Sequence, residues 1–342
     1  MNKMKTILIT GGLGFIGSNF LNLFVLRHPD FQFINLDKIT YSANPSNIIG
    51  LDGLDNYHLI KEDIANSDKI VEVFRKYEPD VVIHFAAETH VDRSISEPAD
   101  FIRTNIIGTF NLLEASRTIW EDYEGKHFHH VSTDEVYGSL GNSGKFTEKT
   151  SYNPSSPYSA SKASSDHLVR AYHKTYDIPT TITNCSNNYG PYQFPEKLIP
   201  LMIVNALRGK NLPIYGSGQN VRDWLYVADH CNAIWRVIEK GKSGETYNVG
   251  GNNERTNIEI VTKICDILAE EKGVNSHYFK KLIQYVKDRP GHDFRYAIDS
   301  TKIYRELKWR PEESFDSGLR KTVKWYVNNI DWVDNIKTKK LK

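Results

Sequence analysis

Cysteine, long apolar runs and net charge are what this sequence has least of. Its three cysteines, Cys185, Cys231 and Cys265, are odd in number and widely spaced, which argues against a disulfide framework and for a reducing compartment. No apolar run approaches the roughly 20 residues that a membrane helix needs. Residues 1–10 pass from lysines directly into a short apolar stretch and glycines. We therefore expect a cytoplasmic protein without a signal peptide or a membrane span.

The charges nearly cancel, because 43 Lys and Arg residues oppose 42 Asp and Glu residues and leave a net charge of +1. Such a chain has no general attraction to nucleic acid or to a membrane surface, so local cations must meet any anionic ligand. No metal site is expected either. His127, His129 and His130 lie close together in the sequence, but no acid or cysteine completes a ligand set with them.

Apolar stretches typical of buried strands alternate with stretches of helical periodicity. This alternation predicts an α/β fold, a Rossmann-type doubly wound parallel sheet with helices on both faces. The expected strands are residues 5–10, 31–36, 57–60, 81–85, 128–132 and 180–183, and the expected helices are residues 68–76, 99–120 and 157–176.

The composition changes after about residue 184, where proline and glycine become more frequent and the periodic segments become shorter. We expect a smaller, mixed C-terminal lobe there that binds substrate. The predicted division is a dinucleotide-binding domain over 1–184, to which 226–250 return, a substrate lobe over 185–225 and 251–330, and a solvated, frayed tail over 331–342.

A glycine-rich loop follows the first predicted strand and opens the first helix. Gly11, Gly14 and Gly17 permit a tight turn and a close approach of the backbone to a pyrophosphate, whose charge then lies at the helix N-terminus. Asp37 ends the second strand, 20 residues after Gly17, where a carboxylate can bind the adenosine ribose hydroxyls. This arrangement favours NAD over NADP, although Asp37 can also be read as a loop-capping residue.

Two adjacent carboxylates follow the strand at 128–132. Neighbouring strand residues point to opposite faces, so Asp134 and Glu135 reach one pocket only if the chain leaves strand geometry at this point. A second reading is that Thr133, Asp134 and Glu135 cap a short helix. The residues by themselves leave both readings open.

Tyr158 and Lys162 lie four residues apart, which places a phenol and an ammonium group on one helix face. A free phenol has a pKa of about 10 and needs a nearby positive charge to act as a base near neutrality. The pair therefore indicates a general base that Lys162 assists.

These motifs together resemble the nucleotide-sugar 4,6-dehydratases of the extended short-chain dehydrogenase family. The resemblance covers nearly the whole chain and rests on residues 11–17, 37–41, 86–92, 133–138, 158–162, 187–191, 197–200, 222–223 and 289–293. Small departures from the family pattern, at Ser42, Thr89 and Phe294, do not touch the expected reacting carbons.

The resemblance implies an NAD-dependent lyase that removes water from a nucleoside diphosphate-glucose, with thymidine as the implied base, and yields a precursor of rhamnose-type deoxysugars. Tyr158 would take the C4 hydroxyl proton, aided by Lys162 and by a hydrogen bond from Thr133. Glu135 would remove the C5 proton and Asp134 would protonate the departing C6 oxygen. The resting protonation of the two carboxyls stays open.

The expected contact residues follow partly from position and partly from the resemblance. Those for NAD are Gly11, Gly14, Phe15, Ile16, Gly17, Asp37, Lys38, Thr40, Asp63, Ile64, Ala86, Ala87, Thr104, Tyr158, Lys162 and Asn188. Those for the nucleotide sugar are Thr89, His90, Thr133, Asn187, Lys197, Leu198, Pro213, Ile214, Tyr215, Arg222, Asn257, Arg289 and His292.

Two alternatives remain. One is another enzyme of this fold, an epimerase or a decarboxylase, which Asp134 disfavours because neither reaction needs an acid at C6. The other is a regulatory protein that binds NAD without catalysis. The resemblance also implies a homodimer that pairs through the helices at 99–120 and 157–176.

Overall fold

The computed structural model describes residues 5–288 and 293–339, and a seven-stranded sheet forms its larger part. Every neighbouring pair in this sheet is parallel, in the order β10-β6-β5-β4-β1-β2-β3. The expected Rossmann-type fold is therefore confirmed. The strands are β1 (Lys5–Thr10), β2 (Phe31–Asp37), β3 (Tyr57–Lys61), β4 (Val81–His84), β5 (His127–Thr133), β6 (Thr180–Cys185) and β10 (Thr246–Val249).

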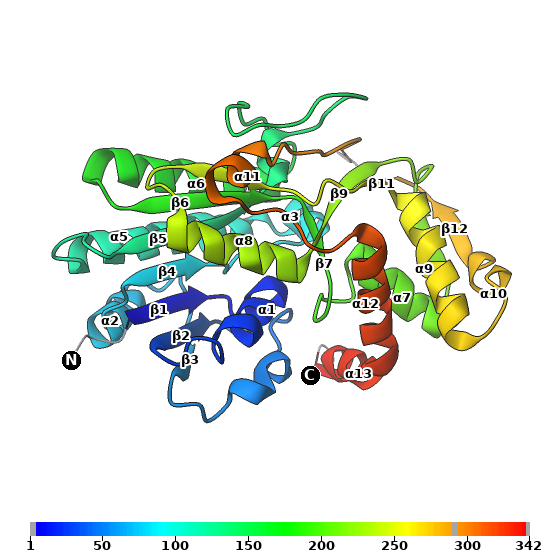
Figure 1. The fold of residues 1–342 in the computed structure, drawn as a ribbon, viewed down its shortest axis with the longest axis horizontal. Coiled ribbons are helices and arrows are strands. Elements are labelled where there is room, and N and C mark those ends of the chain that lie inside the picture. The colour runs from blue at the N-terminus through cyan, green and yellow to red at the C-terminus, as the bar shows by residue number, and fades with distance from the viewer. Residues whose placement is uncertain (1–4, 289–292, 340–342) are drawn as a thin grey trace.

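Helices cover both faces of this sheet (Figure 1). Ile7 and Ile9 of β1 pack on one side with α1 and α8, whereas Leu8 between them packs on the other side with α2, α5 and α6. An apolar run without alternation suits a strand that is buried on both faces. These helices are α1 (Phe15–Phe24), α8 (Val227–Lys240), α2 (Ser67–Tyr77), α5 (Thr109–Ile119) and α6 (Pro157–Tyr176).

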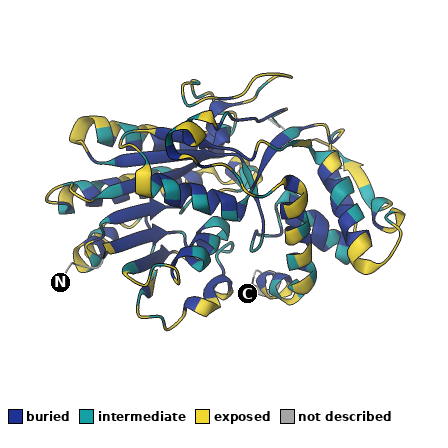
Figure 2. Cartoon of the chain, viewed as in Figure 1, coloured by how far each residue is buried: buried dark blue, intermediate teal, exposed yellow. Residues whose placement is uncertain are grey.

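A smaller lobe lies beyond the carboxyl ends of the main strands (Figure 1). Its core is apolar, and Ile203, Ile264 and Leu319 are fully buried in it (Figure 2). Two small sheets, β11-β9-β7 and β12-β8, complete it. Its elements are β7 (Asn187–Tyr189), α7 (Leu198–Leu207), β8 (Leu212–Tyr215), β9 (Val221–Tyr226), β11 (Glu254–Thr256), α9 (Asn257–Lys272), α10 (His277–Lys280), β12 (Ile283–Val286) and α12 (Phe315–Asn328).

The single helix expected at 99–120 is wrong in detail. The chain forms α4 (Pro98–Phe101), a π-helix (Ile102–Gly108) and then α5. The wider turn brings Thr104 toward the carboxyl edge of the sheet, where π-helical segments often serve a site. The other short elements are α3 (Val91–Ser96) and the 3-10 helices Pro45–Leu51 and Asp134–Tyr137.

Two parts of the expected C-terminal division are also wrong. Residues 330–339 form a helix, α13 (Ile330–Lys339), where a frayed tail was expected, because Val333 belongs to the apolar core of the smaller lobe. Helix α11 (Thr301–Leu307) was expected in that lobe, but Ile303 and Leu307 pack against β10 and α8 of the larger one. No helix in the described residues is long and apolar enough to cross a membrane.

Candidate active site

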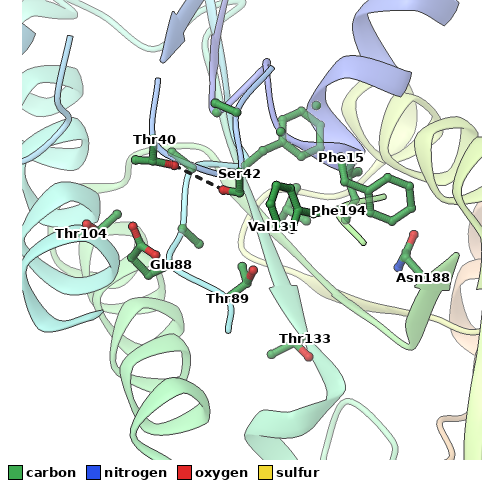
Figure 3. Close-up of a pocket in the computed structure, with 18 of the residues that line it drawn as sticks. Phe15, Thr40, Ser42, Glu88, Thr89, Thr104, Val131, Thr133, Asn188 and Phe194 are labelled. Carbon is green, nitrogen blue, oxygen red and sulfur yellow. Dashed lines mark hydrogen bonds between the residues drawn. The ribbon is translucent and has the colours of Figure 1, made fainter. Parts of the chain in front are cut away.

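A cavity of about 300 Å³ lies at the carboxyl ends of the main strands, between the two lobes. It opens where the strand order reverses, between β1 and β4, the usual ligand position in such sheets. In Figure 3 Thr104 lies on one side of the cavity and Asn188 on the other, with Thr133 at the end of its strand. All of the residues expected to contact NAD, and all five expected to be catalytic, line this cavity.

The glycine loop shows why small residues are needed here. Gly11 has a φ of +74°, and a Cβ there would lie 2.7 Å from the backbone of Ala86. A Cβ on Gly17 would lie 2.4 Å from Gly11 O. A Cβ on Gly14 would meet only Gly11 O, at 3.3 Å. Gly14 therefore faces open space beside the N-terminus of α1, where a ligand backbone or phosphate can approach closely.

The position of Asp37 is compatible with both roles that the sequence left open. Its carboxylate accepts hydrogen bonds from Leu13 N at 3.0 Å and Ile39 N at 2.7 Å, so it organises the loops around it. It also lines the cavity, next to Lys38, which forms an ion pair with Asp63 at 3.0 Å. Each carboxylate oxygen has two acceptor positions, which leaves capacity for a ribose hydroxyl.

The end of β5 likewise satisfies both readings of its sequence. Thr133 is the N-cap of the 3-10 helix, and its hydroxyl accepts a hydrogen bond from Glu135 N at 3.3 Å. This helix ends the strand geometry, so Asp134 and Glu135 both line the same cavity. The cap is thus the device that brings the two carboxyls together.

The two carboxyls differ in environment. Asp134 is almost fully buried, and its Oδ2 has no hydrogen-bond partner in the described part of the chain. Burial raises the pKa of Asp134 well above its ordinary value, and the neighbouring Glu135 and Asp223 raise it further. This raised pKa favours the protonated form of Asp134, which is the form that a general acid uses.

Tyr158 and Lys162 lie on α6, one turn apart, and both are buried. Burial raises the pKa of Tyr158 well above its usual value, Glu135 raises it further, and a hydrogen bond with Thr133 opposes the shift. Burial lowers the pKa of Lys162 to about 8. Its Nζ donates to Val131 O at 2.9 Å, which fixes the ammonium beneath the strand end.

The expected substrate residues divide into two groups. Thr89, Thr133, Asn187 and Lys197 line the cavity, and Lys197 Nζ donates to Thr89 O at 2.9 Å. The other described ones do not line it, namely His90, Leu198, Pro213, Ile214, Tyr215, Arg222 and Asn257. Arg289 and His292 lie outside the described residues.

Local bonding explains some of these positions. His90 caps α3, because its Nδ1 accepts from Arg93 N at 3.3 Å. The Arg222 guanidinium donates to the carbonyls of Val221 and Asp293, each at 2.8 Å, and stacks on the ring of Tyr296. A diphosphate contact by Arg222 stays a prediction.

Several residues of the site were not foreseen. Asp166 and His130 lie fully buried behind Lys162. Asp166 was detectable, because it is four residues after Lys162 and so continues the spacing of Tyr158 and Lys162. The sequence suggests His130 only as a metal ligand, and nothing in its local sequence indicates a contact with Asp166 or Lys162.

The family model for GDP-mannose 4,6 dehydratase matches residues 8–322. The chain belongs to this family. A dTDP-glucose 4,6-dehydratase of Salmonella typhimurium is 54% identical to it over 346 residues, which cover 97% of this chain and 95% of that protein. The expected family is confirmed.

Solved structures of the same fold include both dehydratases and epimerases. A crystal structure of dTDP-glucose 4,6-dehydratase from Bacillus anthracis in complex with NAD superimposes with a TM-score of 0.87 at 48% identity, covering 97% of this chain and 99% of that one. A UDP-glucose 4-epimerase from Thermotoga maritima with UDP-glucose reaches a TM-score of 0.84 at 29% identity, covering 95% and 99%. The fold alone therefore does not decide the reaction, and the side chains at the end of β5 must.

Proposed function

We propose that this family member is an NAD-dependent dTDP-glucose 4,6-dehydratase, which converts dTDP-glucose to dTDP-4-keto-6-deoxyglucose and water. One observation carries the proposal. A buried carboxyl, Asp134, and an adjacent half-buried one, Glu135, share a cavity with the Tyr158 and Lys162 pair. An epimerase needs only the phenol and the lysine, whereas elimination of water also needs an acid and a base. The names of the relatives agree with this choice.

The cavity fits a dinucleotide by its own residues. Gly14 leaves open space at the N-terminus of α1 for a pyrophosphate, and Asp37 lies where ribose hydroxyls are bound. NAD bound there supplies an acceptor for the C4 hydride and a donor that returns it to C6. The Asp37 carboxylate would repel the 2′-phosphate of NADP, so we assign NAD as the cofactor.

The reacting protons are assigned to four side chains. Tyr158 takes the C4 hydroxyl proton, and the resulting ketone makes the C5 proton acidic enough for Glu135 to remove. Asp134 gives its proton to the C6 oxygen, which leaves as water. Glu135 then returns a proton to C5. Because this proton comes from a carboxyl that lines the cavity and is partly exposed, we expect it to exchange with solvent.

The proton balance assigns a further task to Thr133. After one cycle Tyr158 has gained a proton and Asp134 has lost one, so one proton must pass between them. The Thr133 hydroxyl is hydrogen-bonded to Tyr158 and donates to Asp134 Oδ1 at 3.4 Å. Thr133 thus offers a direct route that restores the resting state.

The reaction is tested with dTDP-glucose that carries deuterium at C4. The purified protein should move the label to C6 without added reductant, which shows an internal redox cycle. Retention of label at C4, or its loss to solvent, would contradict the proposal. Parallel reactions with UDP-glucose and CDP-glucose determine the preference for the base.

The role of Glu135 is tested by Glu135→Gln in deuterated water. Bound cofactor should stay in place while exchange of the C5 proton with solvent stops. Glu239→Gln makes the same chemical change on α8, in a side chain that is well exposed, and should leave exchange intact. Near-normal exchange in Glu135→Gln would overturn the assignment.

We infer that the chain forms a homodimer through α5 and α6. Ile102, Ile107, Phe110 and Tyr176 of these helices and of the π-helix are between 41% and 49% exposed, and such apolar groups are usual at interfaces. Phe110→Asp should shift sedimentation toward the monomer, whereas Tyr304→Asp, which replaces an aromatic residue of similar exposure on α11, should not. A wild-type protein that sediments as a monomer would refute this.

The proposal also assigns a ligand to each lobe and a cellular compartment to the protein. Residues 1–184 and 226–250 are assigned to NAD, and residues 185–225 and 251–330, apart from α11, to the nucleotide sugar. The three cysteines are buried and unpaired, which agrees with a reducing cytoplasm.

A further inference from the structure

Helix α6 continues the pattern of its catalytic pair away from the cavity. Tyr158, Lys162, Asp166 and Arg170 follow each other at four-residue intervals and so lie along one side of the helix. The first two line the cavity, whereas Asp166 does not, and its side chain is fully buried. A buried carboxylate is costly unless charges and hydrogen bonds compensate it, so its partners indicate what it does.

The link between Asp166 and Lys162 runs through one imidazole. His130 Nε2 lies 3.3 Å from Lys162 Nζ and also 3.3 Å from Asp166 Oδ1. Its other nitrogen, Nδ1, has no hydrogen-bond partner within the described chain. A nitrogen of a neutral imidazole either donates or accepts, so Nε2 accepts from the Lys162 ammonium here. Asp166 Oδ1 has no hydrogen-bond partner within the described chain, and the carboxylate acts on Lys162 through its charge.

The second oxygen of Asp166 is held from the opposite side. Oδ2 accepts from Tyr152 OH at 2.7 Å and from Asn184 Nδ2 at 3.3 Å. Asn184 Nδ2 also donates to Thr133 O at 3.0 Å, so the same amide holds the end of β5. The carboxylate is thus fixed relative to the strand that carries the reacting groups.

We propose that Asp166 is a positioning residue whose negative charge, one imidazole away, keeps Lys162 an ammonium ion aimed into the cavity. The inference rests on the proposed function, in which Lys162 assists Tyr158. A lone ammonium in this buried place would lose its proton readily. A neutral amine does not stabilise the phenolate, so the base would fail.

The charges of the cluster agree with this assignment. Burial lowers the pKa of Lys162 to about 8, and Asp166 opposes that shift. Burial by itself would raise the pKa of Asp166, but its neighbours outweigh this effect, among them the Lys162 charge and the hydrogen bond from Tyr152, and the pKa is lowered. Burial lowers the pKa of His130 to about 4, so this histidine is neutral when the enzyme works.

Other titratable and charged groups face the cluster from every neighbouring element. They are His84 on β4, His129 on β5, Cys185 on β6, Tyr152 before α6, and Tyr158 and Arg170 on α6. Burial lowers the pKa values of His84 and His129 and raises that of Cys185, so all three are uncharged near neutrality. Lys162, Asp166 and Arg170 then carry the charge.

The test is the pH dependence of cofactor reduction in a single turnover. In Asp166→Asn the fall in rate at high pH, where Lys162 loses its proton, should move to lower pH by about 1 to 3 units. Tyr152→Phe is the matched control, because it removes a hydrogen bond from the same carboxylate but keeps the charge. It should lower stability and leave the pH profile in place. An unshifted profile in Asp166→Asn would overturn the inference.

A double variant decides the question if Asp166→Asn does not fold. Lys162→Met leaves the Asp166 carboxylate without its ammonium, and adding Asp166→Asn removes that charge too. The double variant should unfold at a higher temperature than Lys162→Met, and an equal or lower temperature would refute the coupling. A wild-type protein that makes no 4-keto product would contradict the proposed function instead, since the unfolding temperatures of the two variants do not depend on product formation.

Discussion

Asp134 and Asp166 are both fully buried, one at the cavity end of β5 and the other behind Lys162, yet their pKa values shift in opposite directions. Burial raises both. Around Asp134 the nearby Glu135 and Asp223 are acids that add to this effect. Around Asp166, His130, Lys162 and Tyr152 reverse it. Burial alone therefore does not fix the direction in which the pKa of a buried carboxyl shifts, because the partners of Asp166 reverse its effect whereas the acids around Asp134 add to it.

The difference matches the two tasks that we assign. Asp134 needs a proton to give away, and a surrounding that repels charge keeps that proton in place. Asp166 needs a permanent negative charge, which two donors on its Oδ2 and the charge of Lys162 stabilise. Substitutions at the two carboxyls and at Thr133 should therefore have effects of different size on turnover and stability.

The largest effect is expected on turnover. Asp134→Asn cannot protonate the C6 oxygen, and kcat should fall about 10²- to 10⁴-fold. Because oxidation at C4 continues, reduced cofactor should accumulate on the enzyme and be visible by absorbance. Asp166→Asn should lose far less when it is assayed below the shifted transition of its pH profile, where Lys162 still holds its proton. Equal losses in the two variants would erase the distinction between the carboxyls.

The second effect is on stability near neutral pH. Asp166→Asn removes the counter-charge of a buried ammonium and should cost about 3–5 kcal/mol in the free energy of unfolding. Asp134→Asn removes a buried carboxyl whose acidic neighbours Glu135 and Asp223 act on it more strongly than Arg222 does, so its cost should stay within about 1 kcal/mol or become a gain. Urea denaturation of both variants measures this, and equal destabilisation would speak against the contrast.

The third effect is a difference in pH dependence. The pKa of Asp134 is raised above 3.8, so its folded form binds the proton more tightly and its contribution to stability declines as pH rises from about 4 toward the folded pKa. An amide at this position does not titrate and has no such slope. The advantage of Asp134→Asn should therefore grow from pH 5 to pH 6.5 by up to about 1.4 kcal/mol per unit.

Asp166 gives the opposite pattern in the same titration. Its pKa is lowered below 3.8, so its contribution is complete above that pH and is lost only as pH falls through the folded value. The carboxylate itself therefore adds no pH dependence from pH 5 to pH 6.5. A change in the cost of Asp166→Asn in this interval comes from Lys162, whose lower pKa in the variant makes the cost grow as pH falls, and its absence would show that Asp166 does not support the lysine.

The smallest effect concerns the return of a proton to Asp134. Thr133→Val removes the hydroxyl that joins Tyr158 and Asp134, and steady turnover should fall about tenfold. The first turnover should suffer less, because Asp134 begins protonated. Rapid mixing would then show a burst of product, and Thr133→Ser, which keeps the hydroxyl, should show none. If all turnovers slow equally and no burst appears, proton return to Asp134 through Thr133 is contradicted.

The sequence alone predicted much of the site, because the signals are local. The glycines at 11, 14 and 17, the acid at 37 and the pair at 158 and 162 each lie within one turn, one strand end or one helix. The bounds of α6, Pro157–Tyr176, also agree with the prediction, since its proline and its N-cap serine mark the start. Cofactor, fold and family follow from these residues.

Long-range packing decided the remainder. Helix α13 forms because Val333 finds an apolar core from elements far away in the chain, and no local pattern predicts that core. Arg222 donates to backbone carbonyls that the segment at 293–294 brings to it. His130 meets Asp166 only because β5 lies beneath α6.

The sequence by itself determined that this chain is a Rossmann-type dehydratase with a phenol, a lysine and two adjacent carboxyls. The raised pKa of Asp134 depends on the tertiary structure, because burial and charges from distant segments shift a pKa. The same reason applies to Asp166. Its spacing in α6 is visible in the sequence. Only the fold places His130 Nε2 3.3 Å from both Asp166 Oδ1 and Lys162 Nζ.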